Sequence, residues 1–447
     1  MNCLRRMTGF ALLAALGLIL GSAPAAKAQA AAQDAGKQAY TVPEYNAYQA
    51  AAAEKNPAQQ IKMLDDFTLK YPNSALLVYV YPLYYQAYGA LKTYPKVIEY
   101  ADKLLALGDK TDAPIRYQAY YARAFAYTNL PPPQQQDKDQ ATKAREAAAN
   151  GLKALAEVKK PDNVTDADWA KQILQPKILF NYAGAIAAAA LKDFPATVDS
   201  YKAVLALNPD DAVTSYRIGQ TYLAMTPPQS MDAFWYFARA VTSKGATEAQ
   251  SKQVKGYLRK LIANYQGGAV CDSLTDAELN ELLQLATSSP DRPASYTIPS
   301  SADLDAARKD MTIASVVTDL KAGGDKAKVT WLASCGLEFP DVPGKLIGIV
   351  PGTDAIVLQI AFVTSDAEFQ AASTPNMEVK VVGQPGAARL EKDNPVRFTG
   401  TLNTYDTNPG FMLHWEKAKV NEEDIPKEKA TPKKPAPRRP APKKPGA

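Results

Sequence analysis

Few side chains in this chain have the types and spacing that catalysis or metal binding requires. His414 is the single histidine among 447 residues. No Cys-x-x-Cys, His-Glu-x-x-His or Gly-x-Ser-x-Gly motif occurs, and Gly323-Gly324 indicates a turn rather than a phosphate-binding loop. His414 falls on a predicted strand whose alternation directs it away from the apolar face, so we expect a solvent-facing or edge histidine. The sequence therefore predicts no catalytic residue, no cofactor and no metal site, and we expect a protein that is not an enzyme.

Cys271 and Cys335 are the two cysteines that lie beyond the N-terminal segment. In an oxidising compartment a matched pair favours a disulfide, and two buried thiols acting as small apolar groups are the alternative. A bond requires α-carbons within about 7 Å of each other. It would join the last predicted helices of the N-terminal part to the C-terminal domain.

Tyrosine is concentrated in one part of the chain. Fifteen of the 24 tyrosines lie between Tyr40 and Tyr127. Helical spacing predicts that several share a face, and the residues concerned are Tyr81, Tyr84, Tyr85, Tyr88, Tyr117 and Tyr120. One interpretation is core packing with the hydroxyls at the rim. The other is an aromatic groove that binds an extended peptide or glycan, because tyrosine offers rigid contact area and a hydrogen-bonding tip.

Residues 1–28 have the order of a secretory signal peptide. A pair of arginines precedes an apolar run over residues 10–20, and Ala26-Lys27-Ala28 offers a small-x-small cleavage site. We expect cleavage after Ala28, with Ala30 as an alternative. A retained membrane anchor would need a longer apolar run. This pattern predicts an exported protein, periplasmic or secreted.

Charge is unevenly distributed along the chain. The whole sequence carries a formal net charge of +5, and residues 427–447 alone hold eight Lys or Arg against one Glu. This tail lacks apolar side chains to bury, so we expect a disordered, polyproline-like arm. It either solubilises the protein or attaches it to an anionic envelope polymer or membrane surface. Because the protein is expected to be exported, no nucleic acid partner is expected.

Residues 43–287 have the composition and periodicity of consecutive helices that are separated at proline-containing turns. The spacing predicts helix pairs over residues 43–72, 75–109, 113–159, 166–211 and 212–245. Single helices are expected over 246–265 and from Thr275, where Thr275 and Glu278 match a capping box.

The clearest repeat covers residues 178–211, a unit of 34 residues that ends at the Asn208-Pro209 turn. The next helix opens with Ile218, Gly219 and Tyr222, a pattern in which the small residue allows a neighbouring helix to approach closely. These features resemble the tetratricopeptide repeat (TPR) of exported bacterial proteins. The resemblance implies an α-solenoid that binds a protein partner in its groove.

The sequence changes character after a linker at 288–300 that is rich in serine and proline. Within 301–421 we expect one helix near 313–321, ended by Gly323-Gly324, followed by short strands. The expected strands are 328–332, 345–350, 355–363, 378–382, 396–405 and 411–420. Five or six short strands suit a small β-barrel, and their spacing resembles an OB-like fold.

Together these patterns predict a multidomain protein with an all-α TPR-like solenoid, a small β-rich barrel domain and a disordered basic tail. We expect an exported, non-enzymatic scaffold for protein–protein interactions in the bacterial cell envelope, with a protein or peptide partner. The alternative is a carbohydrate- or peptidoglycan-binding envelope protein that uses the β domain or the basic tail.

Overall fold

The computed structural model describes residues 40–268, 271–352 and 355–427. The chain divides into a helical unit (Met1–Leu261 and Leu279–Thr297) and a barrel unit (Ile262–Glu278 and Ile298–Ala447). The predicted signal peptide and the basic tail from residue 428 lie outside the described residues. Within the described ranges, no helix combines the length and apolar character needed to cross a membrane.

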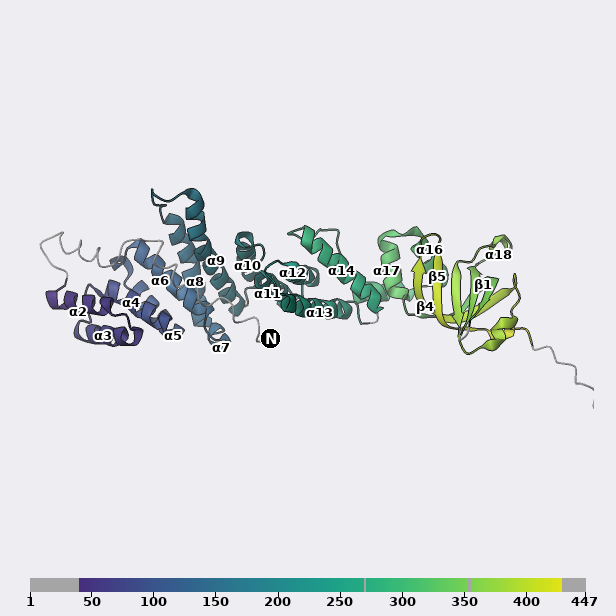
Figure 1. Cartoon of the computed structure of the whole chain (residues 1–447), viewed down its shortest axis with the longest axis horizontal. Coiled ribbons are helices and arrows are strands. Elements are labelled where there is room, and N and C mark those ends of the chain that lie inside the picture. The colour runs from purple at the N-terminus through teal and green to yellow at the C-terminus, as the bar shows by residue number, and fades with distance from the viewer. Residues whose placement is uncertain (1–39, 269–270, 353–354, 428–447) are drawn as a thin grey trace, which may run out of the picture. The chain divides into compact units, whose positions relative to one another are not determined.

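The helical unit consists of successive antiparallel helix pairs (Figure 1). The pairs are α2 (Val42–Ala53) with α3 (Pro57–Lys70), α4 (Leu77–Ala90) with α5 (Tyr94–Leu105), α6 (Ala113–Thr128) with α8 (Lys138–Glu157), α9 (Asp166–Ala190) with α10 (Phe194–Leu207), and α11 (Ala212–Ala224) with α12 (Ser230–Thr242). The short α7 (Pro132–Gln135) lies in the long connection of the third pair, and α13 (Glu248–Tyr265) and α14 (Asp272–Ser288) follow the last pair. The five predicted pairs therefore match the helices of the structure.

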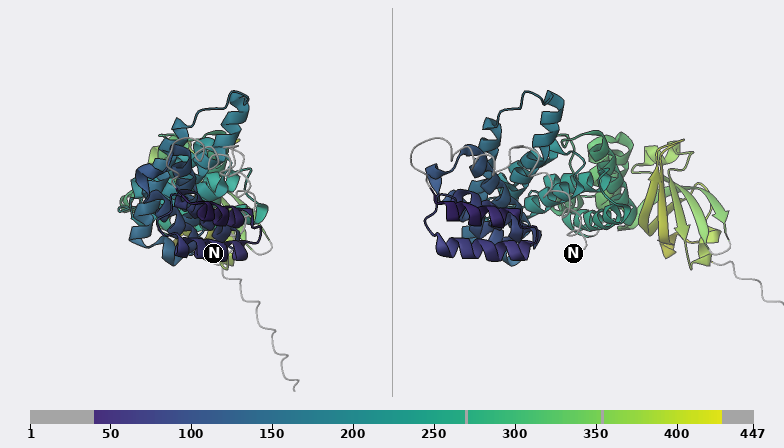
Figure 2. Two further views of the ribbon diagram at one scale, coloured as in Figure 1. Left: turned by 90° about the vertical axis from the view of Figure 1, so that its left-hand side faces the viewer. Right: turned by 60° about the vertical axis from the view of Figure 1, so that its left-hand side comes forward.

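Local sequence signals set where these helices begin. Asp112, Asp137, Asp193 and Asp211 each precede a helix and accept a hydrogen bond from a backbone N–H of its first turn. Proline occupies the first turn of α2, α3, α5, α6 and α10. Its missing N–H breaks no hydrogen bond there, because the N–H groups of the first turn have no acceptor within the helix. Helices α8 and α9 have 20 and 25 residues, and Figure 2 shows the end of this pair projecting beyond the neighbouring helices.

Two helix-to-helix turns of this unit have the same sequence and the same geometry. Ala90-Leu91-Lys92 and Ala190-Leu191-Lys192 lie 100 residues apart. Lys92 and Lys192 both adopt a left-handed backbone conformation, with φ of 57° and 60°. The leucine N–H donates to the carbonyl of Ala87 in the first turn (3.1 Å) and to that of Ala187 in the second (3.1 Å). The second and fourth pairs thus share the conformation of the turn that joins their two helices.

Glycine permits close helix contact at two positions. A β-carbon at Gly219 of α11 would lie 2.9 Å from the ring of Phe237 in α12, as expected from the small residue in the sequence pattern. A β-carbon at Gly151 of α8 would lie 2.2 Å from the ring of Phe180 in α9. Both rings are fully buried, so neither ring can move aside into solvent.

The barrel unit contains a closed barrel in the strand order β1-β2-β3-β5-β4. The strands are β1 (Glu338–Pro351), β2 (Ile356–Phe362), β3 (Met377–Val381), β4 (Pro395–Asp406) and β5 (Met412–Val420). The ladders are antiparallel except for the parallel pair β3–β5. Residues that alternate along the strands fill the interior, among them Leu358, Ile360, Val379, Phe398 and Trp415.

Helices and short 3₁₀ turns complete the barrel unit. Helices α15 (Ser301–Lys309), α16 (Ile313–Ala322) and α17 (Gly324–Ser334) precede β1, α18 (Asp366–Ala371) lies between β2 and β3, and η4 (Pro385–Arg389) lies between β3 and β4. Val316, Leu320 and Ala387 from these elements join the core of the barrel. Gly323 ends α16 with a φ of 72°, as the double glycine predicted.

The structure corrects three details of the sequence prediction. Residues 328–332 were expected to form a strand but belong to α17, because Ala327, Thr330 and Ser334 bury one helical face there. The strands therefore begin only at Glu338. The predicted capping box at Thr275 is wrong, since α14 already begins at Asp272 and Thr275 is buried within it.

The division of the chain also differs from the prediction of one boundary at 288–300. Residues 262–278 belong to the barrel unit. The disulfide between Cys271 and Cys335 holds part of this segment to the residues that lead into β1. The chain thus enters the barrel unit before the predicted linker, and Leu279–Thr297 return to the helical unit.

Candidate functional site

The first helices of the pairs form the candidate site, and we call them the first-helix row (α2, α4, α6, α9 and α11). Consecutive members of the row contact one another. The rings of Tyr48 in α2 and Tyr79 in α4 are 6.2 Å apart, and those of Tyr117 in α6 and Phe180 in α9 are 6.1 Å apart. Helix α4 packs against α6, and a cation–π contact joins α9 to α11. The row is therefore continuous through the helical unit.

Each helix of the first-helix row carries at least one partly exposed tyrosine, and we select one from each helix. We call this set the row tyrosines, and its members are Tyr45, Tyr79, Tyr120, Tyr182 and Tyr216. Two of the four successive separations in this set equal the 34-residue repeat, Tyr45 to Tyr79 and Tyr182 to Tyr216, whereas Tyr120 lies in the pair with the longer helix connection. Repeated side chains on successive helices of a solenoid can bind a ligand that runs along it.

Hydrogen bonds orient the two outermost row tyrosines in the same way. The amide of Gln49 donates to the hydroxyl of Tyr45 (2.8 Å), and the amide of Gln220 donates to the hydroxyl of Tyr216 (3.2 Å). Burial raises the pKa of Tyr182 to about 12, so its hydroxyl stays protonated at neutral pH. These phenols offer both a hydrogen-bond donor and an acceptor beside an apolar ring.

The tyrosines predicted to line a groove divide into two groups. Tyr84, Tyr85 and Tyr117 are buried, so their assignment to an open binding surface is wrong. Tyr81, Tyr88 and Tyr120 are partly exposed.

Neighbouring helices explain why Tyr84 is buried. Its hydroxyl donates to Asp65 Oδ1 of α3 (2.7 Å), and its ring stacks 3.9 Å from Tyr100 of α5. The rings of Tyr81 and Tyr88 also lie against Tyr100. Tyr81, Tyr84 and Tyr88 of α4 therefore mainly pack against the neighbouring helices. Sequence reasoning missed the other row tyrosines, Tyr45, Tyr79, Tyr182 and Tyr216. The 34-residue spacing was the signal that could have found them.

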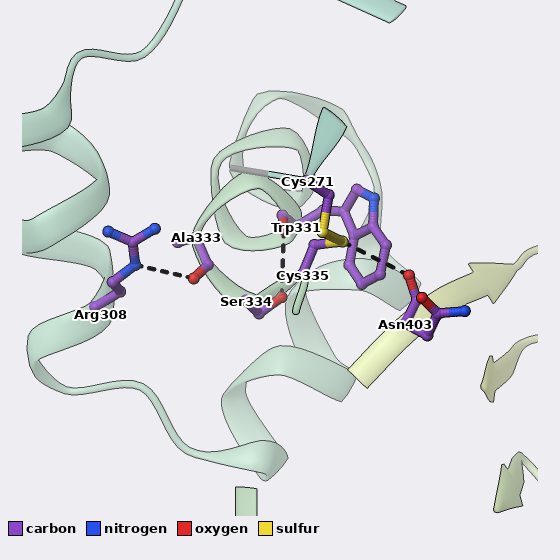
Figure 3. The surroundings of a disulfide bond; sticks show 7 residues. All are labelled: Cys271, Arg308, Trp331, Ala333, Ser334, Cys335 and Asn403. Atoms are coloured by element: carbon purple, nitrogen blue, oxygen red, sulfur yellow. Dashed lines mark hydrogen bonds between the residues drawn. A yellow bond between two sulfur atoms is a disulfide. The ribbon is translucent and has the colours of Figure 1, made fainter. Parts of the chain in front are cut away.

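Cys271 and Cys335 form a disulfide in the structure. Their sulfurs are 2.10 Å apart, and their α-carbons are 6.1 Å apart, within the range that the sequence prediction required. Figure 3 shows the bond beside the indole of Trp331, with Asn403 beyond the indole on the same side. Cys335 Sγ lies 3.6 Å from the carbonyl oxygen of Asn403, and the following Gly336 donates its N–H to Leu402 of β4 (2.8 Å). The disulfide thus fixes the entry into the barrel, and we assign it a structural role.

His414 lies on β5 with its side chain partly exposed, as the strand alternation predicted. Its Nε2 is 2.8 Å from Asp406 Oδ2, and its Nδ1 is 3.8 Å from Glu378 Oε1. In the part of the chain that the structure describes, no group of three or more His, Cys, Asp or Glu side chains is placed to hold a metal ion. The histidine and its carboxylates therefore form a polar cluster on the barrel.

A scan of the chain against protein-family models gave no match, and a search of curated proteins gave none. The functional argument therefore depends on the residues of the first-helix row and on the geometry around them.

Proposed function

We propose that the protein is an exported, non-enzymatic scaffold of the TPR type that binds an extended protein segment along the first-helix row. The observation that carries this proposal is the repetition of a partly exposed tyrosine on each helix of a continuous row. The identical turns at Lys92 and Lys192 support the repeat assignment. The N-terminal sequence pattern, together with the disulfide, supports placement in the bacterial cell envelope.

The chemistry of the row suits an extended polypeptide. Such a segment exposes backbone N–H and C=O groups along its length, and both find partners in tyrosine hydroxyls and glutamine amides. The tyrosine rings add apolar contact area, and they have few rotatable bonds to immobilise. Because the helices hold the rings in place before binding, part of the ordering cost is already met in the free protein.

The test is affinity capture from a cell-envelope extract with full-length protein. Tyr45→Ser together with Tyr216→Ser removes two hydrogen-bonding rings from the row, and we expect the captured protein partner to be lost. The control is Leu69→Ser together with Val350→Ser, since both side chains are exposed and lie on α3 and β1, outside the row. Equal capture by the two double variants, with both melting like the native protein, would reject the proposal.

The alternative is a carbohydrate- or peptidoglycan-binding role for the barrel unit. Its five-stranded closed barrel supports an OB-like assignment, and such barrels use the face of strands 2 and 3 for oligosaccharides. Here that face carries Gln359, Glu378 and Lys380, which are at least partly exposed. Co-sedimentation with purified peptidoglycan separates the two roles. Loss of sedimentation on Gln359→Ala with Lys380→Ala, but not with the double tyrosine variant, would favour the alternative.

A further inference from the structure

Arg217 is a positively charged side chain on the first-helix row that forms no close ion pair with a carboxylate among the described residues. It extends from α11 toward α9 and α10, where its guanidinium carbon lies 5.2 Å from the ring centroid of Tyr182. Its Nη1 donates to the hydroxyl of Tyr201 (3.2 Å). The rings of Tyr182 and Tyr201 meet edge to face, 5.9 Å apart. Two tyrosines thus fix the guanidinium from two helices.

Several other partly or fully buried arginines donate to backbone carbonyls or pair with carboxylates. Arg116 donates to the carbonyl of Thr111, and Arg239 donates to that of Pro290 (2.8 Å). Arg123 lies 2.6 Å from Asp102, and Arg292 lies 3.2 Å from Asp232. Arg217 forms no such pair within 4.0 Å among the described residues.

Asp211 is the acidic residue that acts electrostatically on Arg217, but its oxygens serve another purpose. They accept hydrogen bonds from the backbone N–H of Thr214 (3.0 Å) and from its hydroxyl (2.7 Å), which caps α11. A partly desolvated guanidinium without a counter-ion is costly, because the charge has lost water without gaining an anion. An anionic ligand that bound the guanidinium of Arg217 would offset this cost.

We propose that Arg217, held by Tyr182 and Tyr201, binds a carboxylate of an acidic peptide segment that lies along the first-helix row. This inference rests on the proposed scaffold function and specifies the chemistry of the partner. The planar guanidinium can donate two parallel N–H bonds to one carboxylate, a geometry that lysine cannot reproduce. One guanidinium matches the single charge of a carboxylate.

The test uses fluorescence anisotropy with full-length protein at low salt. The probes are a fluorescein-labelled oligo-glutamate peptide and an oligo-glutamine peptide of the same length. We expect the native protein to bind oligo-glutamate in preference to oligo-glutamine. Arg217→Gln should weaken oligo-glutamate binding about tenfold or more, as expected for loss of a charged hydrogen-bonded pair. Arg145→Gln is the matched control, because it removes an equal charge from α8 at a more exposed position. It should bind oligo-glutamate like the native protein.

A second variant guards against a folding defect in Arg217→Gln. Tyr201→Phe keeps the ring in the core but removes the hydroxyl that orients Arg217, so we expect weaker binding with a native melting curve. Equal losses in Arg217→Gln and Arg145→Gln would overturn the proposal, because the effect would then be one of net charge. It would also be overturned if oligo-glutamate failed to bind, or if inorganic polyphosphate bound through Arg217 while oligo-glutamate did not.

These outcomes are distinct from failure of the scaffold function. If Arg217→Gln still captured the envelope partner while the Tyr45 and Tyr216 double variant did not, the row would bind a protein without a carboxylate anchor. If neither variant lost the partner, the scaffold function itself would be rejected.

Discussion

Replacing glycine by alanine at three helical positions should give opposite changes in stability, although the substitution is the same. In a helix interior, this change alone stabilises by about 1 kcal/mol. At Gly256 of α13 an added β-carbon meets no atom within 4 Å, so we expect the full gain. At Gly219 the β-carbon would lie 2.9 Å from Phe237, so the gain and the packing cost should nearly cancel.

At Gly151 the packing cost should prevail. The new β-carbon would lie 2.2 Å from one ring atom of Phe180 and 2.4 Å from the next. Because that ring is fully buried, the helices themselves must separate. Forcing a methyl group into a packed core costs about 3 kcal/mol at the upper end of the usual range. After the helix gain is subtracted, Gly151→Ala should destabilise by about 2 kcal/mol.

The assay is thermal unfolding of the full-length protein, followed by far-ultraviolet circular dichroism. A difference of about 3 kcal/mol between Gly256→Ala and Gly151→Ala corresponds to about 6–12 °C for a unit of this size. The predicted order of melting temperature is Gly256→Ala above native, Gly219→Ala near native, and Gly151→Ala well below. A Gly151→Ala protein that melts at or above the native temperature would refute the close contact between α8 and α9.

Three further predictions concern buried polar groups, the disulfide and pH. The hydroxyl of Tyr85 is buried without a hydrogen-bond partner among the described residues, so Tyr85→Phe should raise the free energy of unfolding by up to about 1 kcal/mol. Tyr84→Phe should lower the free energy of unfolding, because it removes the hydrogen bond to Asp65. Urea unfolding of the two variants measures both changes. Cys271→Ser removes the disulfide, which closes a loop with a sequence separation of 64, and should lower the free energy of unfolding by up to about 4 kcal/mol. Dithiothreitol should lower the urea midpoint of the native protein but not that of the variant. A hydrogen bond from Lys326 holds the pKa of Asp319 below its usual value, so its stabilising effect should be present above about pH 4 and be lost as the pH falls through the lowered pKa. The stability difference between native protein and Asp319→Asn should therefore shrink on acidification, and a difference that grows would contradict the pairing.

The helical unit was predictable because its signals are local. Apolar periodicity, helix-breaking prolines and aspartates before first turns each act within a few residues, so the helix pairs followed from the sequence. The strands β1 to β5 were predictable for a similar reason, since Val396, Phe398 and Leu402 alternate toward one core. The segment 328–332 failed because its Val329, Thr330 and Trp331 favour a strand locally. Packing of α17 against α16, including the hydrogen bond from Thr330 to Asp319 (3.0 Å), prevailed over that preference.

The candidate site was less predictable because burial depends on distant helices. Tyr81 and Tyr84 belong to one helix and similar faces, yet Tyr84 is fully buried and Tyr81 is partly exposed. The ring of Tyr84 stacks 3.9 Å from that of Tyr100 and its hydroxyl reaches Asp65 of the preceding helix, whereas the ring of Tyr81 lies 6.1 Å from that of Tyr100. Likewise, the sequence could identify Arg217 as a charge but not as one that forms no close ion pair with a carboxylate among the described residues. That property depends on three helices and on the use of Asp211 as a cap.

The most direct test of the scaffold function is site-specific photo-crosslinking in the cells that produce the protein. A benzophenone amino acid is placed in turn at Tyr45, Tyr120 and Tyr216 of the first-helix row, and at the exposed Leu69 of α3 as the control. If an extended partner lies along the row, the three row positions should give the same cross-linked protein, and Leu69 should give none. Adducts from Leu69 alone, or different proteins at each row position, would contradict binding along the first-helix row.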